Sequence, residues 1–265
     1  MTVAIVVQVS EGLVLAADSA MIVQGELRLP GQPPQAGLLK IYNSATKIVQ
    51  LRDWPVGVVT FGAAQIGNRT IESHVREFAG SRPDEQPQSI EQLARELHAF
   101  IAPRIPDVAP PGQLGVHLAG YPSQGFFPEQ YLLSFPGDVE RIRPDNPDGS
   151  PNFGATWHGM TDAINRLYMG IEPQARTALV AAGVTEQQLA VLSQFEYPVI
   201  WGAMPLQDAI DFAAWLAEIA IGRFRFVVGA AMVVGPVDIA IVTPQGFRWI
   251  RRKTPEVSPQ HPFVF

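Results

Sequence analysis

The first part of the chain alternates between short apolar runs and polar or glycine-containing corners. Val3–Val9 and Leu13–Asp18 are rich in Val, Leu and Ala and flank a Ser-Glu-Gly corner, which predicts a β-hairpin. Their apolar positions are nearly continuous, so we expect this sheet to be covered on both faces. Lys47–Leu51 and Val56–Phe61 predict a second hairpin of the same kind.

Between these hairpins, Gln24–Leu38 is rich in proline and glycine. Proline fixes one backbone dihedral and lacks an N–H donor, whereas glycine favours tight corners. This composition predicts an extended loop and excludes a helix.

A repeat of three to four residues replaces the strand pattern after Gly62. It predicts a helix over Ala63–Phe78 and a second helix that begins after Ser89, an N-cap residue with Gln92 three positions later. Further helices are predicted at Thr161–Met169, Pro173–Gly183, Thr185–Leu192 and Leu206–Ile221. Further strands are predicted at Leu114–Ala119, Tyr131–Phe135, Val139–Ile142, Val237–Thr243 and Phe247–Ile250.

The predicted elements are segregated rather than alternating. Strands come first, then two helices, strands, helices and strands, which is typical of α+β folds and not of βαβ units. The 265 residues show no internal repeat and no linker between two cores. We therefore expect a single domain that covers residues 1–265.

Charge and cysteine content narrow the function classes. A net charge of −6 argues against nucleic acid or an anionic membrane as a partner. The chain has no cysteine, which excludes disulfides, thiolate nucleophiles and cysteine-based metal sites. The uncharged stretch Phe226–Val237 is too short to span a bilayer, and Val3–Val9 is too short for a signal peptide. These features favour a cytoplasmic protein.

The chain lacks the motifs that bind common cofactors. There is no G-x-G-x-x-G or P-loop motif, and the five histidines have no metal-ligand spacing. We therefore expect neither a metal nor an organic cofactor. Thr2 is the one candidate nucleophile, because removal of Met1 would give an N-terminal threonine whose hydroxyl attacks and whose α-amine accepts the proton.

Several segments follow Thr2 in a distinctive order. They are Leu15-Ala16-Ala17-Asp18-Ser19, Thr46-Lys47-Ile48 and Thr60-Phe61-Gly62-Ala63-Ala64, followed later by Gly159-Met160-Thr161-Asp162-Ala163 and the helix Leu206–Ile221. Together they resemble the proteasome β-subunit family of N-terminal nucleophile (Ntn) hydrolases over most of the chain. The resemblance implies a four-layer αββα sandwich, in which two antiparallel sheets lie between helical layers.

The resemblance also implies catalytic roles. Thr2 would be the nucleophile, Lys47 would stabilise its alkoxide, and Asp18 would keep Lys47 charged and oriented. Gly62, expected where a strand turns into a helix, would offer its N–H to the oxyanion. Ser19 would support the site. The alternative to these catalytic roles is that Lys47 and Asp18 form an ordinary ion pair at the end of a strand.

The resemblance also implies a substrate pocket, and the chain departs from the family pattern at two of its polar positions. Met21, Thr60 and Ala64 would line the first specificity pocket, whose small apolar walls favour an apolar side chain. His158 replaces the family's serine before the third helix, where it could relay a proton or cap the helix. The family's Asp-x-x-Ser after the last helix has no counterpart in Gly229–Gly235.

From these observations we expect a threonine-type peptidase or amidohydrolase that acts on a peptide or protein. A homo-oligomer is expected, because the helix Leu206–Ile221 is apolar over much of its circumference. Insertions are expected near residues 22–40 and 171–204, with a C-terminal tail over residues 251–265. Two alternatives are a non-catalytic subunit of an assembly and a hydrolase of small amides. The sequence does not show whether the protein has an unfoldase partner.

Overall fold

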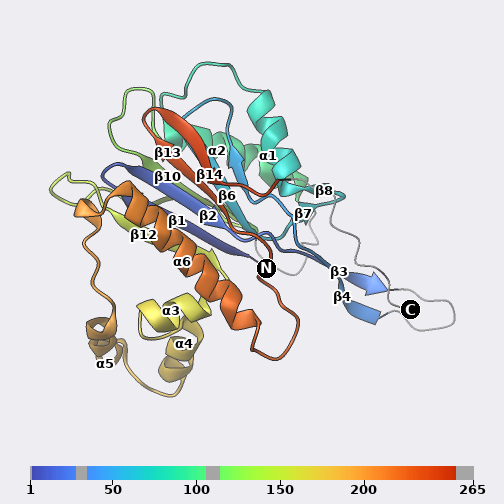
Figure 1. The fold of residues 1–265 in the computed structure, drawn as a ribbon, viewed down its shortest axis with the longest axis vertical. Helices are drawn as coiled ribbons and strands as arrows, with labels where there is room; N and C mark the ends of the chain where they lie inside the picture. Colours follow the sequence, from blue (N-terminus) through green and yellow to red (C-terminus); the bar gives the residue numbers. More distant parts are fainter. Residues whose placement is uncertain (1, 28–34, 106–113, 255–265) are drawn as a thin grey trace.

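A computed structural model of the chain describes residues 2–27, 35–105 and 114–254 and has a mixed α+β architecture with several antiparallel sheets (Figure 1). The first sheet has the order β12-β1-β2-β13-β14 and the second has the order β11-β10-β9-β6-β5. The strands of the first sheet are β1 (Val3–Val9), β2 (Gly12–Ala17), β12 (Gly154–Gly159), β13 (Asp238–Thr243) and β14 (Gly246–Arg251). Those of the second are β5 (Ile48–Gln50), β6 (Val56–Gly62), β9 (Leu114–Gly120), β10 (Glu129–Phe135) and β11 (Val139–Ile142).

Strand β1 has only one polar residue, Gln8, because both of its faces are covered. All seven of its residues are buried. Val3 and Ile5 pack in an apolar cluster with residues of helix α6 (Leu206–Phe224). Ala4 and Val6, which point to the opposite face, belong to a cluster that includes residues of the second sheet. A strand covered on both faces needs an apolar residue at nearly every position, as the sequence predicted.

The second sheet carries its own helices on its other face. Helices α1 (Ile71–Gly80) and α2 (Ile90–Ile101) pack there, and Phe78 and Leu97 lie in one cluster with Val58 of β6. The predicted cap of α2 is confirmed, because the Ser89 hydroxyl accepts a hydrogen bond from the backbone N–H of Gln92 at 3.1 Å. Figure 1 shows α6 and the pair α1–α2 on opposite sides of the two sheets.

Two predictions are wrong in the residues that the structure describes. Residues 24–38 were expected to form a loop; 28–34 lie outside the described residues, whereas 24–27 and 35–38 belong to β3 (Met21–Leu27) and β4 (Gln35–Tyr42), which pair antiparallel and project from the body in Figure 1. Residues 63–70 were expected to be helical, but they contain the short strands β7 (Gln65–Ile66) and β8 (Arg69–Thr70). Gly67 turns between β7 and β8 with φ of +58°. Helix α1 therefore begins only at Ile71.

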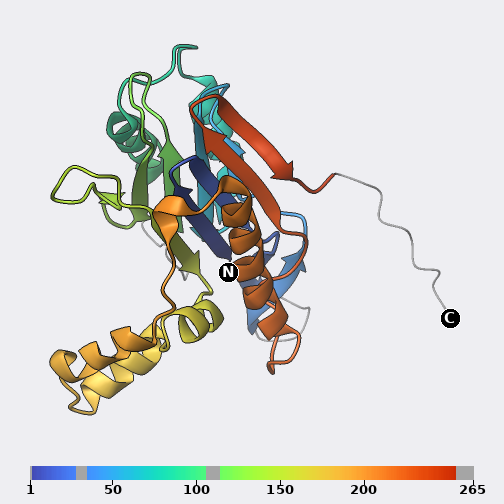
Figure 2. The ribbon, with the colours of Figure 1, turned by 60° about the vertical axis from the view of Figure 1, so that its left-hand side comes forward.

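Strand β12 and the helices that follow it shape one edge of the molecule. No strand was predicted at β12, which pairs with β1 and completes that edge of the first sheet. The next helices are α3 (Asp162–Tyr168), α4 (Pro173–Ala181) and α5 (Glu186–Leu189). In Figure 2, α4 and α5 stand away from the two sheets. Within the described ranges, no helix combines the length and apolarity needed to cross a bilayer.

A candidate active site around Thr2

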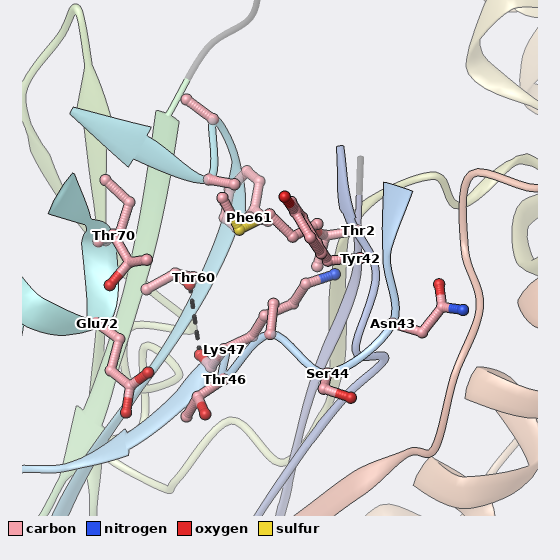
Figure 3. Close-up of a pocket in the computed structure, with 15 residues that line it drawn as sticks. Thr2, Tyr42, Asn43, Ser44, Thr46, Lys47, Thr60, Phe61, Thr70 and Glu72 are labelled. Carbon is pink, nitrogen blue, oxygen red and sulfur yellow. Dashed lines mark hydrogen bonds between the residues drawn. The ribbon is translucent and has the colours of Figure 1, made fainter. Parts of the chain in front are cut away.

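A cavity of about 400 Å³ opens at the start of β1 (Figure 3). Its lining includes Thr2, Met21, Lys47, Thr60 and Ala64, five of the residues that the sequence singled out. Thr2 precedes β1, Met21 lies in β3, Lys47 precedes β5, Thr60 lies in β6 and Ala64 follows it. The start of β1, the β3–β4 pair and the second sheet therefore meet at this cavity. In Figure 3 the Lys47 side chain points toward Thr2.

Asp18 lies behind the cavity wall and holds three groups in place. Its Oδ1 accepts hydrogen bonds from the Lys47 Nζ at 2.7 Å and from the Val3 N–H at 2.9 Å. Its Oδ2 accepts a bond from the Ala20 N–H at 2.9 Å. The Asp18 side chain is fully buried and that of Lys47 is only 6% exposed. The carboxylate thus fixes the lysine relative to the start of β1.

The environment of Lys47 changes its acidity. Burial lowers the pKa of its ammonium group, the Asp18 carboxylate counteracts part of this effect, and the nearby charge of Lys253 lowers the pKa further. The Lys47 carbonyl accepts the Thr60 N–H at 2.9 Å, which sets the position of the lysine relative to β6. Lys47 is therefore held in a fixed position beside Thr2 by its bond to Asp18 and by its backbone pairing with Thr60.

Ser19 supports the site without lining the cavity. Its hydroxyl donates to the Pro236 carbonyl at 2.7 Å, and its own carbonyl accepts the Ala45 N–H at 2.9 Å. These bonds connect the segment before β13 with the segment that carries Lys47. Its part in the structure is to position the backbone around the lysine.

Gly62 does not have the surroundings that the sequence predicted. It ends β6 with φ of +83°, and its neighbours Phe61 and Ala63 line the cavity. The expected helix directly after it is absent, because α1 starts at Ile71. A helix N-terminus therefore does not orient the Gly62 N–H, and only its left-handed backbone conformation distinguishes this position.

His158 lies between the two sheets rather than against Thr2. It faces Ala4 across the β1–β12 pairing, and its ring stacks on Phe61 with 4.5 Å between ring centroids. Its Nε2 lies 3.1 Å from Nδ1 of His117. Within the described residues, no side-chain hydrogen bond or ring contact joins His158 to Thr2 or to the N-terminus of α3. Thr161, the N-cap of α3, makes no side-chain capping bond.

His117 continues this contact into a buried chain of polar side chains. Its Nε2 lies 3.0 Å from Oε1 of Gln130, whose amide nitrogen donates to Oε1 of Gln8. His117, Gln130 and Gln8 are each at most 3% exposed. Since Gln130 Oε1 is an acceptor, His117 Nε2 donates, and its unprotonated Nδ1 accepts from His158. The hydrogen bonds among these four side chains can thus all form with both imidazoles neutral.

Burial explains why both imidazoles stay neutral. It lowers the pKa of His117 to about 3, with smaller contributions from His158 and Arg143, and it lowers the pKa of His158 to about 4. Desolvation is the cause, because the ring is enclosed between the sheets.

Comparison with known proteins adds no assignment. No protein-family model matches the chain, and a search of curated proteins finds no match. Within the part of the chain that the structure describes, no group of three or more His, Asp or Glu side chains is placed to hold a metal ion. The site must therefore be interpreted from its own geometry.

Two features of this region were not predicted from the sequence. Glu72 lines the cavity, although its place in a predicted helix gave no sign of it. His117 was one of five histidines without a recognisable pattern, and its partner His158 lies 41 positions away. Neither feature has a local signal, because both depend on contacts between distant segments.

Proposed function

We propose that this chain is a threonine-type Ntn hydrolase that cleaves amide bonds in a peptide or protein. The observation that supports this best is the position of Thr2 on a cavity beside the buried pair Lys47–Asp18. A buried ion pair adds little net stability once desolvation is counted. Its placement beside a hydroxyl nucleophile favours a chemical role.

The proposed reaction begins once cleavage before Thr2 frees its α-amine. The amine takes the hydroxyl proton while Oγ bonds to the amide carbon, and the Lys47 ammonium stabilises the negative charge that develops on oxygen. The C–N bond then breaks, the leaving amine takes the proton, and the acyl group stays on Thr2 as an ester. Water hydrolyses this ester and restores the hydroxyl.

The proposal includes a four-layer αββα sandwich as the fold. Three apolar clusters support it: one between α6 and the first sheet, one containing residues of both sheets, and one between α1–α2 and the second sheet. The antiparallel pairing within both sheets is consistent with it.

Intact mass spectrometry tests the nucleophile. Protein made in cells should begin at Thr2, and an epoxyketone or β-lactone probe should add once, at Thr2. The Thr2→Ala variant is the matched control and should not be labelled. An active preparation in which every chain retains Met1 would contradict this mechanism.

A non-catalytic subunit of a self-assembling homo-oligomer is the second candidate. It is favoured by the lack of acidic or hydroxyl side chains in Gly229–Gly235 and by the contact of His158 with His117 instead of Thr2. Complete processing without any probe labelling would support this candidate. A small-amide hydrolase, which the size of the cavity also permits, would release amine from small amides and leave peptides intact.

A further inference from the structure

The cavity has a polar side that the expected apolar pocket did not include. Glu72, in the first turn of α1, lines it together with Thr46 and Thr70. Figure 3 shows Glu72 and Thr70 across the cavity from Thr2. A substrate side chain that enters beside Thr2 would therefore extend toward a carboxylate and hydroxyl groups.

The walls between Thr2 and Glu72 are largely apolar. Met21, Ala63, Ala64 and Ile71 contribute them. An apolar passage that ends at a carboxylate matches a long side chain with a methylene stem and a cationic head. Lysine and arginine have this form, and they characteristically bury the stem while the charged head reaches a polar group.

The charges around the cavity favour a cation over an anion. Lys47 also lines the cavity, but its ammonium group is paired with the buried Asp18 carboxylate, whereas Glu72 is the acidic residue in the lining. Glu72 Oε1 accepts a bond from Arg76 Nε at 2.9 Å, and the Arg76 side chain is 52% exposed. A carboxylate has about four acceptor positions, so this single bond leaves capacity for a substrate cation.

We propose that this cavity is a specificity pocket for a lysine or arginine side chain, with Glu72 as the residue that binds the cationic head. The position of the cleaved bond next to that residue rests on the proposed function. The binding preference itself does not need the nucleophile and can be measured without it.

The test compares two peptides that differ only in the head group. Binding of acetyl-Gly-Gly-Lys-amide and acetyl-Gly-Gly-norleucine-amide to the Thr2→Ala protein is measured by NMR titration. Norleucine keeps the four-carbon stem without the ammonium group. We expect the lysine peptide to bind about fivefold more tightly, as for a charge pair at a partly exposed site.

Two further variants assign the preference to Glu72. Glu72→Gln, in the same background, should abolish it, and Glu72→Lys should reverse it in favour of a glutamate peptide. Glu91→Gln is the matched control, because Glu91 lies in the first turn of α2 and pairs with Arg95 four residues later, as Glu72 does with Arg76. It should leave the preference unchanged.

Each outcome decides the proposal. The pocket proposal would be overturned by equal binding of the two peptides, by tighter binding of the norleucine peptide or by no binding of either. A lysine preference that survives Glu72→Gln would also overturn it. Labelling of the processed wild-type protein with lysine and norleucine epoxyketones then separates it from the proposed function. A retained lysine preference without labelling rejects the nucleophile alone, whereas faster labelling by norleucine rejects the pocket alone.

Discussion

Lys47 combines a buried charge with a fixed position beside Thr2. The carboxylate of Asp18 keeps two backbone N–H donors, from Val3 and Ala20, even when the lysine is removed. The energetic cost of the uncompensated carboxylate is therefore reduced.

We expect Lys47→Ala to lower kcat/KM by about 100-fold or more, because it removes charge stabilisation in the transition state. Asp18→Asn should lower it less, since the lysine remains while its orientation weakens. Peptide hydrolysis rates and thermal unfolding of each variant provide the measurement. Wild-type turnover in Lys47→Ala would exclude the assigned role.

The histidine pair between the sheets predicts a dependence of stability on pH. Both histidines have an ordinary pKa of 6.5, whereas in the folded protein the pKa is about 4 for His158 and about 3 for His117. Between pH 6.5 and 4 the unfolded chain binds more protons. The free energy of unfolding therefore decreases as the pH falls, by about 1.4 kcal/mol per unit for each histidine, and this contribution is fully present above pH 6.5.

His117→Asn should remove one titrating group and make this dependence shallower. Between pH 7 and pH 5 the variant should lose about 2 kcal/mol less than the wild type, as measured by urea unfolding at each pH. His117→Asn/His158→Asn should lose less still. Identical slopes for all three proteins would show that the imidazoles do not titrate as described.

At the scale of elements, the packing of β6 against β9 and β12 shapes the cavity wall. Phe61 of β6 lines the cavity, stacks on His158 of β12 and lies over Gly115 of β9. A Cβ atom at Gly115 would lie 2.0 Å from the Phe61 ring, so glycine is required there by the close approach of the ring.

Gly115→Ala should therefore push Phe61 out of its stack. We expect a loss of about 1–3 kcal/mol in the free energy of unfolding, as for other overpacked sites, together with slower labelling of Thr2. Gly80→Ala at the end of α1 is the control, because its Cβ would meet no atom within 4 Å. Equal stability of the two variants would contradict this view of the wall.

At the scale of the whole molecule, the segment from α4 to residue 200 exposes several large apolar side chains. Phe195 is 60% exposed and Ile200 is 81% exposed. In Figure 2, helices α4 and α5 of this segment stand away from the two sheets. Exposed apolar groups of this size are typical of surfaces that associate.

We expect the protein to form a homo-oligomer through this segment. Light scattering at micromolar concentration should give a mass above one chain, and Phe195→Asp/Ile200→Asp should reduce it. Phe126→Asp is the control, because Phe126 is 80% exposed but lies between β9 and β10, and it should leave the mass unchanged. A monomer in the unmodified protein would refute this expectation.

The sequence by itself determined the elements whose signals are local. The bounds of β1 follow from a continuous apolar run, and α2 follows from the Ser89 cap and an apolar stripe. The residues around Thr2 were also found from sequence, and five of them line one cavity. Such features depend on neighbours within a few positions, which the order of residues shows directly.

Only the tertiary structure decided the features that depend on distant partners. β12 is a strand because β1 offers its edge, and β3 and β4 are strands because each pairs with the other. Glu72 reaches the cavity because β7 and β8 delay the start of α1. The imidazoles of His117 and His158 are neutral because two sheets enclose them. Burial and pairing of this kind are set by segments far apart in the chain, so no local pattern could predict them.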